Sequence, residues 1–476
     1  MAKTISDIKT PGVYVYEVSN FPPSVAQVST AIPIFIGYTE LAKDAAGKPL
    51  NKKPTKIFSL LEYVQFFGKA FNEKKVAVEV DKKTASSVTT SVTAGASIAD
   101  VSAYNMYYSL RHYFDNGGGP CYILSVGEFD NPITDTDLEE GLKIAAAYDE
   151  PTIIVFPEGS SLGEDKYYAL IDKTITQCAN LQDRFALVDL VTLNTTDTTT
   201  TNINNFRSIS PHTTGFKRNN DLNYAAAYYP NLVTTYGYQY DESNVDVTIT
   251  TDGTAASAVK LNTLKDTDKA TYYKAVEAIG KLTLTLPPSP AIAGVYAKVD
   301  GERGVWKAPA NVSLSSVSDL TDIVTDQEQE GMNIDADTGK SVNAIRAFSG
   351  KGILVWGART LDGNSSEFKY ISVRRFFIMV EESVKKATAA FVFEPNDANT
   401  WVKIRAMIEN YLTLLWREGA LAGAKPEHAF FVKVGLGQTM SAIDILEGRL
   451  IVEIGMAAVR PAEFIILRFS HKMQES

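Results

Sequence analysis

The chain has 476 residues, 45% of them hydrophobic and 10% aromatic, so we expect two or three domains with cores of their own. Its 46 basic and 56 acidic side chains give a net charge of -10, which argues against nucleic acid as a partner. Cys121 and Cys178 lie far apart and outside any CxxC pair, so no disulfide framework or thiolate metal site is expected. The amino terminus lacks a signal-peptide pattern, and no run approaches about eighteen consecutive apolar residues. We therefore expect a cytoplasmic protein that does not insert into membranes.

Residues 1-22 are predicted to form an extended arm. The turn signal Thr10-Pro11-Gly12 precedes VYVYEV at 13-18, a run of β-branched and aromatic residues that favours a strand. Residues 22-33 contain three prolines and cannot form a regular helix. The first globular element then begins with a short buried strand at 34-37.

The middle of the chain alternates continuous apolar strands with helices, which indicates a partly parallel α/β sheet. The expected strands lie at 121-126, 152-156 and 185-190, and the expected helices at 104-114 and 167-180.

Two segments interrupt this pattern and are predicted to be peripheral insertions of an outer region, 23-340. Residues 73-103 change from an alternating apolar pattern to a Ser/Thr/Ala-rich stretch, which indicates a hairpin. Residues 241-270 alternate around an Asp-Gly turn. The proline-rich segment 284-290 is expected to be non-helical and to lead toward a second domain.

The second domain is predicted at 341-460, followed by a carboxy-terminal arm at 461-476. A helix at 399-418 has an apolar face at 3.6-residue spacing, so we expect it in a core. A helix at 370-388 and strands at 352-356, 429-434 and 450-454 complete the domain. The chain then ends in a strand-like apolar run, Phe464-Ile465-Ile466-Leu467-Arg468-Phe469.

Charge differs between the two parts of the chain. Residues 1-340 carry 29 basic and 42 acidic side chains, net -13, whereas residues 341-476 carry 17 and 14, net +3. The difference is compatible with chance, or with a carboxy-terminal domain that meets an acidic partner. On the second interpretation the candidate contact residues are the neighbouring basic pairs of the 370-388 helix, Arg374, Arg375, Lys385 and Lys386, which an ordinary helix surface would also explain.

No pattern of catalytic, cofactor-binding or metal-binding residues is found. The four histidines are scattered without metal-ligand spacing, and the Gly-Gly-Gly-Pro run at 117-120 lacks the lysine and hydroxyl residue of a phosphate loop. A Gly-x-Ser-x-Gly elbow is absent, and Glu139-Glu140 and Glu381-Glu382 are adjacent pairs that would not share a helix face. We therefore expect no enzyme and no cofactor, with an α/β enzyme of unfamiliar signature as the alternative.

The positive signal lies at the two chain ends. Apolar strand-forming tracts need a sheet with which to pair, because exposed strands with unpaired backbone groups promote aggregation. Pairing within one chain and pairing with a neighbour by β-augmentation are both compatible with the sequence. The residues predicted to make such contacts are Pro11, Gly12, Val13, Tyr14, Val15, Tyr16, Val18, Phe464, Ile465, Ile466, Leu467 and Phe469.

Several of these stretches, in order, resemble the tail sheath proteins of contractile phages and of phage-tail-like contractile injection systems. The quoted motifs are TPGVYVYE, GGPCY at 118-122, PPSPAIAGVYAKVDGERGVWKAPAN at 287-311, VNAIRAFSGKGILVWGARTL at 342-361, KYISVRRFF, FVFEPNDANTW and VRPAEFIILRFSHK. The resemblance implies a mixed α/β, multi-domain subunit with β-strand arms at both ends. The strands of 350-460 would receive the arms of neighbouring subunits.

The resemblance also implies partners and a mode of action. Copies of the chain would stack as six-membered rings into a helical sheath around an inner tube, and would meet baseplate and tail-terminator proteins. The 341-460 domain would face the tube, and a metastable extended state would contract without nucleotide hydrolysis. Such a particle, a virion tail or an injection device, is assembled in the bacterial cytoplasm. A type VI secretion sheath is the alternative, but it is built from two different chains.

Overall fold

The computed structural model describes residues 24-85, 88-192, 196-209, 214-255 and 258-466. The chain divides into two compact units, which are described separately. The larger unit comprises Gln27–Glu382 together with the described residues from Ala458 on, and the smaller comprises Ser383–Ala457 together with the described residues before Gln27.

A nine-stranded mixed sheet forms the centre of the larger unit. Its inner strands β5, β1, β6, β7, β8 and β16 are parallel, and its outer strands pair antiparallel, which confirms the predicted α/β class. In spatial order the strands are β14 (Val312–Ser313), β17 (Gly352–Val355), β16 (Val342–Phe348), β8 (Ala225–Tyr229), β7 (Phe185–Asp189), β6 (Ile153–Val155), β1 (Pro33–Thr39), β5 (Cys121–Glu128) and β2 (Thr55–Ile57).

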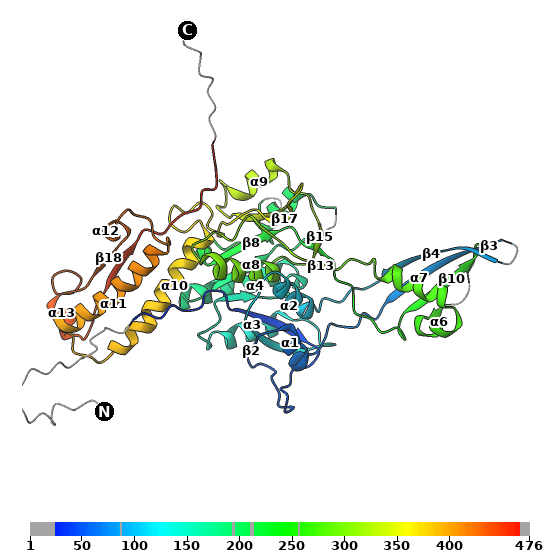
Figure 1. Ribbon diagram of the computed structural model, residues 1–476, viewed down its shortest axis with the longest axis horizontal. Helices are drawn as coiled ribbons and strands as arrows, with labels where there is room; N and C mark the ends of the chain where they lie inside the picture. The colour runs from blue at the N-terminus through cyan, green and yellow to red at the C-terminus, as the bar shows by residue number, and fades with distance from the viewer. Residues whose placement is uncertain (1–23, 86–87, 193–195, 210–213, 256–257, 467–476) are drawn as a thin grey trace, which may run out of the picture. The chain divides into compact units, whose positions relative to one another are not determined.

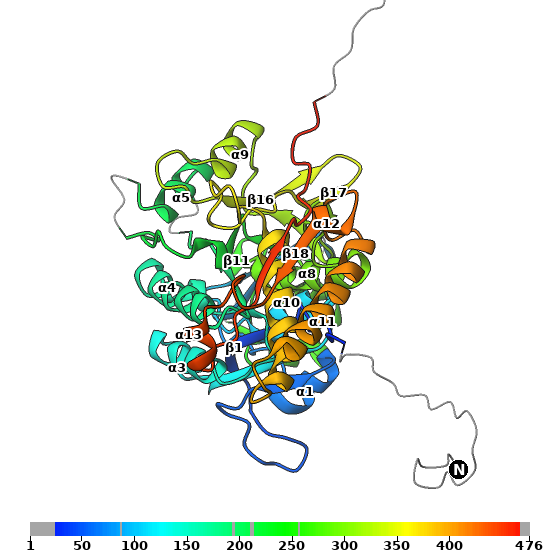
Figure 2. The same cartoon turned by 90° about the vertical axis from the view of Figure 1, so that its left-hand side faces the viewer.

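Helices cover both faces of this sheet. The ring of Phe35 in β1 contacts Tyr113 of α2 (Met106–Asp115), whereas the next residue, Ile36, lies against Gly141 of α3 (Asp135–Ala145). Because neighbouring strand residues point to opposite faces, α2 and α3 lie on opposite sides of the sheet. Figure 2 shows α3 on the left of the sheet. Helix α8 (Ser289–Arg303) packs beside α2, and α4 (Glu164–Leu181) packs beside α3. The remaining helices of this unit include α1 (Leu60–Phe67), α5 (Thr199–Phe206), α9 (Asp326–Asn333) and α10 (Ile371–Thr388), of which the residues from Ser383 on belong to the smaller unit.

The carboxyl ends of β6 and β7 are used to cap helices. Glu158 accepts hydrogen bonds from the backbone N–H groups of Asn105 and Met106, 3.1 and 2.8 Å away, where α2 begins. Asp189 accepts from the backbone N–H and hydroxyl of Ser289, 2.8 and 2.5 Å away, where α8 begins. In open α/β sheets this edge is where ligands usually bind. Here two helix N-termini and their own carboxylates occupy it.

The Glu158 carboxyl makes a pH-dependent contribution to stability. Burial raises its pKa from 4.5 to about 8, so between these values the folded chain holds a proton that the unfolded chain releases. Its contribution is therefore full below about pH 4.5 and is lost as the pH rises through 8. We expect the Glu158→Gln chain to lose less stability than wild type between pH 5 and 8.5 in denaturant titrations. Parallel pH profiles of the free energy of unfolding for the two chains would contradict this prediction.

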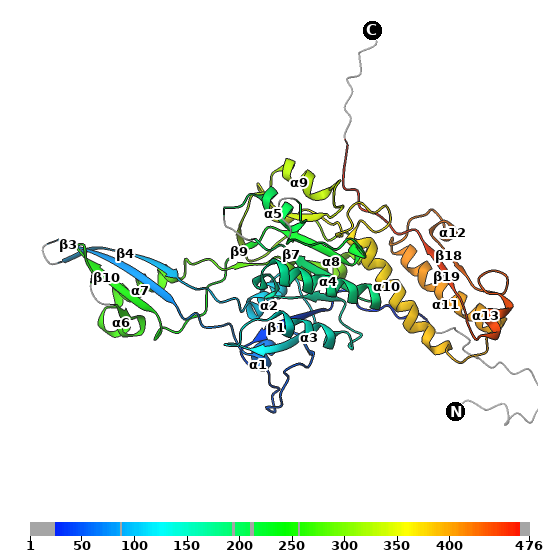
Figure 3. The ribbon, with the colours of Figure 1, turned by 180° about the vertical axis from the view of Figure 1, so that it is seen from behind.

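A second, five-stranded sheet belongs to the two predicted insertions. Strands β3 (Val76–Ala85) and β4 (Val88–Ile98) form the expected antiparallel hairpin, and β10 (Asp246–Thr251) adds parallel to β3. Helices α6 (Leu261–Thr267) and α7 (Lys269–Ile279) pack against this sheet (Figure 1 and, from behind, Figure 3). The remaining short strands here are β11 (Thr254–Ala255) and β12 (Val259–Lys260), and a separate small sheet contains β13 (Thr285–Leu286), β9 (Leu232–Thr234) and β15 (Val317–Leu320).

Two expectations about the middle of the chain are wrong. The segment 284-290 does not end in an irregular passage, because α8 begins at Ser289 with Pro288 at its N-cap and Pro290 in the first turn. Proline is tolerated there because the first N–H groups of a helix have no partner within it. The boundary expected at 340 also moves, since β16 pairs with β8 in the main sheet and the two compact units divide between Glu382 and Ser383.

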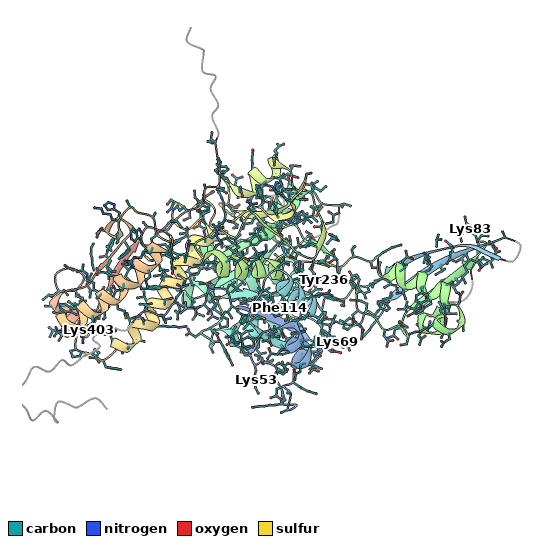
Figure 4. All side chains as sticks on the ribbon, viewed as in Figure 1. Lys53, Lys69, Lys83, Phe114, Tyr236 and Lys403 are labelled. Atoms are coloured by element: carbon teal, nitrogen blue, oxygen red, sulfur yellow. The ribbon has the colours of Figure 1, made fainter. Side chains whose placement is uncertain are left out.

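The smaller unit is built on α11 (Ala398–Arg417) and a two-stranded sheet. Asp397 caps α11 by accepting from the backbone N–H of Thr400, and the predicted apolar face is buried at Ile404, Ile408 and Leu415. Lys403, labelled in Figure 4, is on the exposed side of this helix. The other elements are η4 (Ala389–Phe391), α12 (Pro426–Ala429), β18 (Phe430–Lys433), α13 (Ala442–Leu446) and β19 (Glu453–Met456). Across the described ranges, we find no helix with the length and apolarity needed to cross a membrane.

Candidate assembly site

The carboxy-terminal arm is attached to the larger unit by a buried ion pair. Arg359 donates from Nε and Nη2 to the two carboxylate oxygens of Glu463, at 3.0 and 2.6 Å. The Arg359 side chain is 5% exposed and that of Glu463 is 20% exposed. Two parallel charge-assisted bonds fix both the position and the direction of the carboxylate.

The surroundings of Arg359 hold it in this orientation. Its Nη1 donates to the backbone carbonyls of Asn333 and Gly363, at 3.0 and 3.2 Å, and its own backbone N–H donates to Oδ1 of Asn343 at 2.7 Å. The Tyr370 hydroxyl donates to Glu463 at 3.3 Å. Burial and the nearby Glu463 carboxylate raise the pKa of Tyr370, so this hydroxyl stays a donor at neutral pH.

Immediately beyond this anchor the chain exposes three consecutive large apolar side chains. Phe464, Ile465 and Ile466 are 68%, 79% and 79% exposed, and none of them lies in a strand. The arm residues Leu467 and Phe469 lie outside the described residues, as do Pro11, Gly12, Val13, Tyr14, Val15, Tyr16 and Val18.

Among the described residues, the sheet of the smaller unit has an unpaired edge on each side. Strands β18 and β19 pair with each other from Phe430 opposite Met456 to Lys433 opposite Glu453, and no further strand among the described residues pairs with either. The ring of Phe431 lies so close to Gly455 that a Cβ there would meet it at 2.2 Å, so a larger residue at 455 would displace the ring. Phe431 is nevertheless 44% exposed.

Arg374 and Arg375, predicted as exposed tube-facing cations, are buried, and that prediction is wrong. Arg375 donates to both carboxylate oxygens of Asp300, at 3.1 and 2.6 Å, and lies over the Tyr296 ring. Arg374 donates to Glu381 at 2.6 Å and lies over the ring of Phe368. Each arginine is 4% exposed. Their apolar neighbours in the fold, which the local sequence did not reveal, cover them.

The charge argument for an acidic partner also loses its support. Within the smaller unit, Ser383–Ala457, there are eight basic and eight acidic side chains, so its net charge is zero. Lys385 and Lys386 are exposed and keep their predicted role as a hypothesis.

The described residues offer little to acid–base or metal chemistry. His112 is buried, and burial lowers its pKa to about 4, so it is neutral at physiological pH. Burial raises the pKa of both cysteine thiols, which keeps them protonated and unreactive. Across the described ranges no three His, Cys, Asp or Glu side chains gather as a metal site would require.

Sequence reasoning located the arm but missed its anchor. Asn343 and Arg359 lie in the quoted motif at 342-361, and Glu463 lies in the closing VRPAEF. A single arginine next to a strand end gave no signal of its own, since the partners are about a hundred residues apart in sequence. A folded body with an anchored, exposed apolar end and an open-edged sheet is the construction of a polymerising structural subunit.

Comparisons with known proteins agree with this class. The model of the phage tail sheath C-terminal domain matches residues 364–472. The tail sheath protein of Vibrio phage KVP40 is 27% identical over 128 residues, which are 27% of this chain and 19% of that protein. The tail sheath protein of Enterobacteria phage T4 is 25% identical over 127 residues, again 27% of this chain and 19% of that protein. The chain thus matches less than a fifth of the length of these phage relatives.

Solved structures match over almost the whole chain. A chain of the anti-feeding prophage (AFP) helical sheath in its contracted state is 31% identical with a TM-score of 0.63, covering 98% of this chain and 100% of that one. A chain of the sheath complex of PVC, an extracellular contractile injection system, also in the contracted state, is 32% identical with a TM-score of 0.61, covering 98% of both chains. The chain therefore belongs to the contractile sheath proteins of phage tails and phage-tail-like injection systems.

Proposed function

We propose that this chain polymerises as stacked six-membered rings into a sheath around an inner tube, and that contraction of the sheath drives the tube through a target envelope. The observation that supports this most directly is the anchored carboxy-terminal arm with its exposed Phe464, Ile465 and Ile466. A soluble chain that exposed them permanently would aggregate, so a partner that covers them is required.

The partner sheet is β18–β19 of a neighbouring subunit. Its two open edges offer room for one added strand on each side, which suits the two arms of the chain. About five backbone hydrogen bonds per arm, at about 1 kcal/mol each, would contribute several kcal/mol before the ordering cost. Repeated in every subunit, these contacts link the sheath while leaving the two compact units free to change their arrangement.

The other partners follow from the relatives. The matched chains come from AFP and PVC sheath structures and from an AFP baseplate. The partners we propose for this chain are therefore other copies of itself and a baseplate. An inner tube along the lumen, with Lys385 and Lys386 as candidate contacts, and a tail-terminator protein complete the assembly. The particle forms in the bacterial cytoplasm. Because both arms are on a single chain, a sheath of phage-tail type is favoured over a type VI secretion sheath, which is built from two different chains.

Electron microscopy of the purified chain tests the proposal. We expect hollow, striated tubes with helical order, formed by the chain alone or on added tube protein. A chain that stays a monodisperse monomer at high concentration under both conditions would overturn the proposal.

Deleting residues 1-20 isolates the contribution of the amino-terminal arm. Because this segment precedes the first strand of the core, we expect the circular dichroism spectrum and the melting temperature to stay unchanged. Tube formation should be lost, since one of the two arm contacts of every subunit is missing. Loss of folding in the deletion chain would contradict the assignment of these residues to contacts between subunits.

A further inference from the structure

A groove of about 940 Å³ runs beside the root of the carboxy-terminal arm, within the larger unit. One wall is the arm itself, from Pro461 to Ile465. The other wall and the floor come from α9, from the loop after α8 and from the residues after β17, with Ala308, Ala310, Ile334 and Trp356 as apolar members.

The groove has more apolar surface than the arm covers. Ile334, the residue after α9, is 56% exposed although it lines the groove. Phe464 and Ile465 also line it, yet they are 68% and 79% exposed. The two apolar surfaces thus face a common space that neither fills.

The anchor leaves the outer arm able to turn toward this space. Glu463 is held by Arg359 and Tyr370, so the direction of the arm is fixed up to this residue. Beyond it, Phe464, Ile465 and Ile466 make no hydrogen bond with any other described residue. Rotation about the few backbone bonds after Glu463 moves these side chains without disturbing the anchor.

We infer that this groove is the docking site of the subunit's own carboxy-terminal arm before assembly, and this rests on the proposed function of the arm. Phe464 to Phe469 covers about 20 Å when extended, enough to cross the groove. Of the charged residues in the rest of the lining, Asp326 is paired with Arg346, while Glu330 and Lys307 are of opposite sign. The arm and the groove are therefore matched in apolar character.

In dilute solution the subunit's own arm should occupy the groove in preference to the arm of a neighbouring subunit. The segment begins at the groove, so its local concentration is in the millimolar range, well above that of separate subunits in dilute solution. Docking buries the residues that would otherwise cause premature association. Pairing with β18–β19 of a neighbour then competes with docking, so polymerisation begins only where subunits are concentrated, as on a baseplate.

A disulfide trap tests the inference in the full-length chain. We combine Ile334→Cys with Ile465→Cys, both at exposed positions, while the native Cys121 and Cys178 are buried and do not interfere. Oxidation of dilute monomer should give most of the chain as an internally linked monomer on non-reducing gels. The matched control pairs Ile465→Cys with Ile323→Cys, which is 86% exposed and outside the groove lining. It should not link.

Each other outcome of the trap overturns the inference. Dimers linked through these cysteines would mean that a neighbour's arm occupies the groove. Equal internal linking in the control would mean that the arm contacts the surface outside the groove as often as the groove itself. Absence of linking would mean that the arm does not dock. The linked monomer should also fail to form tubes until it is reduced.

Tube formation reports separately on the proposed function. If the wild-type chain forms tubes and the trap fails, only the docking is wrong. If the wild-type chain forms no tubes on tube protein, the proposed function fails, whatever the gel shows.

Discussion

Replacing Arg375 by methionine is expected to lower the free energy of unfolding by about 3–5 kcal/mol, the usual cost of breaking a buried ion pair from one side. Methionine fills much of the volume, so the loss comes mainly from the uncompensated charge of Asp300, which is 6% exposed. Among the side chains of the described residues, Asp300 would keep only the hydroxyl of Thr30, 2.6 Å away. Denaturant unfolding of the unassembled chain measures the change.

Two further variants make this prediction specific to the pair. Adding Asp300→Asn to Arg375→Met removes the unpaired charge of Asp300, so a large part of the lost free energy of unfolding should be recovered. Arg405→Met is the matched control, because Arg405 forms an exposed pair with Glu409 on α11 and should cost at most about 0.5 kcal/mol. A change of that small size for Arg375→Met would contradict the buried-pair assignment.

This prediction replaces a different expectation about the same residues. As surface cations, Arg374 and Arg375 would have affected binding to a tube and left folding intact. In the fold, Arg375 ties α10 to Asp300 of α8 and to the backbone carbonyl of Thr30, so it joins three distant segments of the larger unit. Any effect of these arginines on assembly is therefore indirect, through the stability of the subunit.

Sequence patterns predicted the elements whose signal is local. The apolar face of α11 and the continuous apolar strands β1, β5 and β7 were correctly placed, because periodicity and strand preference depend on neighbouring residues. The hairpin β3–β4 was predicted for the same reason.

Features set by distant residues were missed. The prolines at 287-290 indicated a helix-breaking passage, and only the position of Pro288 and Pro290 at the very start of α8 makes them compatible with a helix. The boundary at 340 failed because β16 pairs with β8, more than a hundred residues earlier in the chain. The arginines of α10 were misassigned because no local pattern distinguishes a buried arginine with a distant carboxylate from an exposed one.

The same limit applies to the assembly site. The apolar run at the carboxyl end was evident from residue types, and so was its need for a partner sheet. Its anchor was not, because the Glu463 carboxylate meets Arg359 only in the folded chain. The exposed apolar residues begin immediately after the anchored one, so the anchor decides where the arm leaves the body.

Replacing Glu463 by alanine is therefore expected to release the arm without unfolding the body. Arg359 would lose both bonds from Nε and Nη2 and keep those from Nη1 to two carbonyls. Because Glu463 is partly exposed, we expect a local loss of about 1–3 kcal/mol. If the anchor orients the arm for pairing, the critical concentration for tube formation should rise by about tenfold for each 1.4 kcal/mol lost.

Chymotryptic cleavage separates this effect from general destabilisation. Cleavage after Phe464 should speed up in the Glu463→Ala chain, since a detached root lets the backbone around Phe464 enter the protease, while the melting temperature of the body should stay close to wild type. Glu277→Ala is the matched control, because Glu277 forms only exposed pairs with Lys274 and Lys281 on α7. It should change neither cleavage nor assembly. A Glu463→Ala chain that formed tubes at the wild-type concentration would mean that the arm finds its partner sheet without a fixed point of departure.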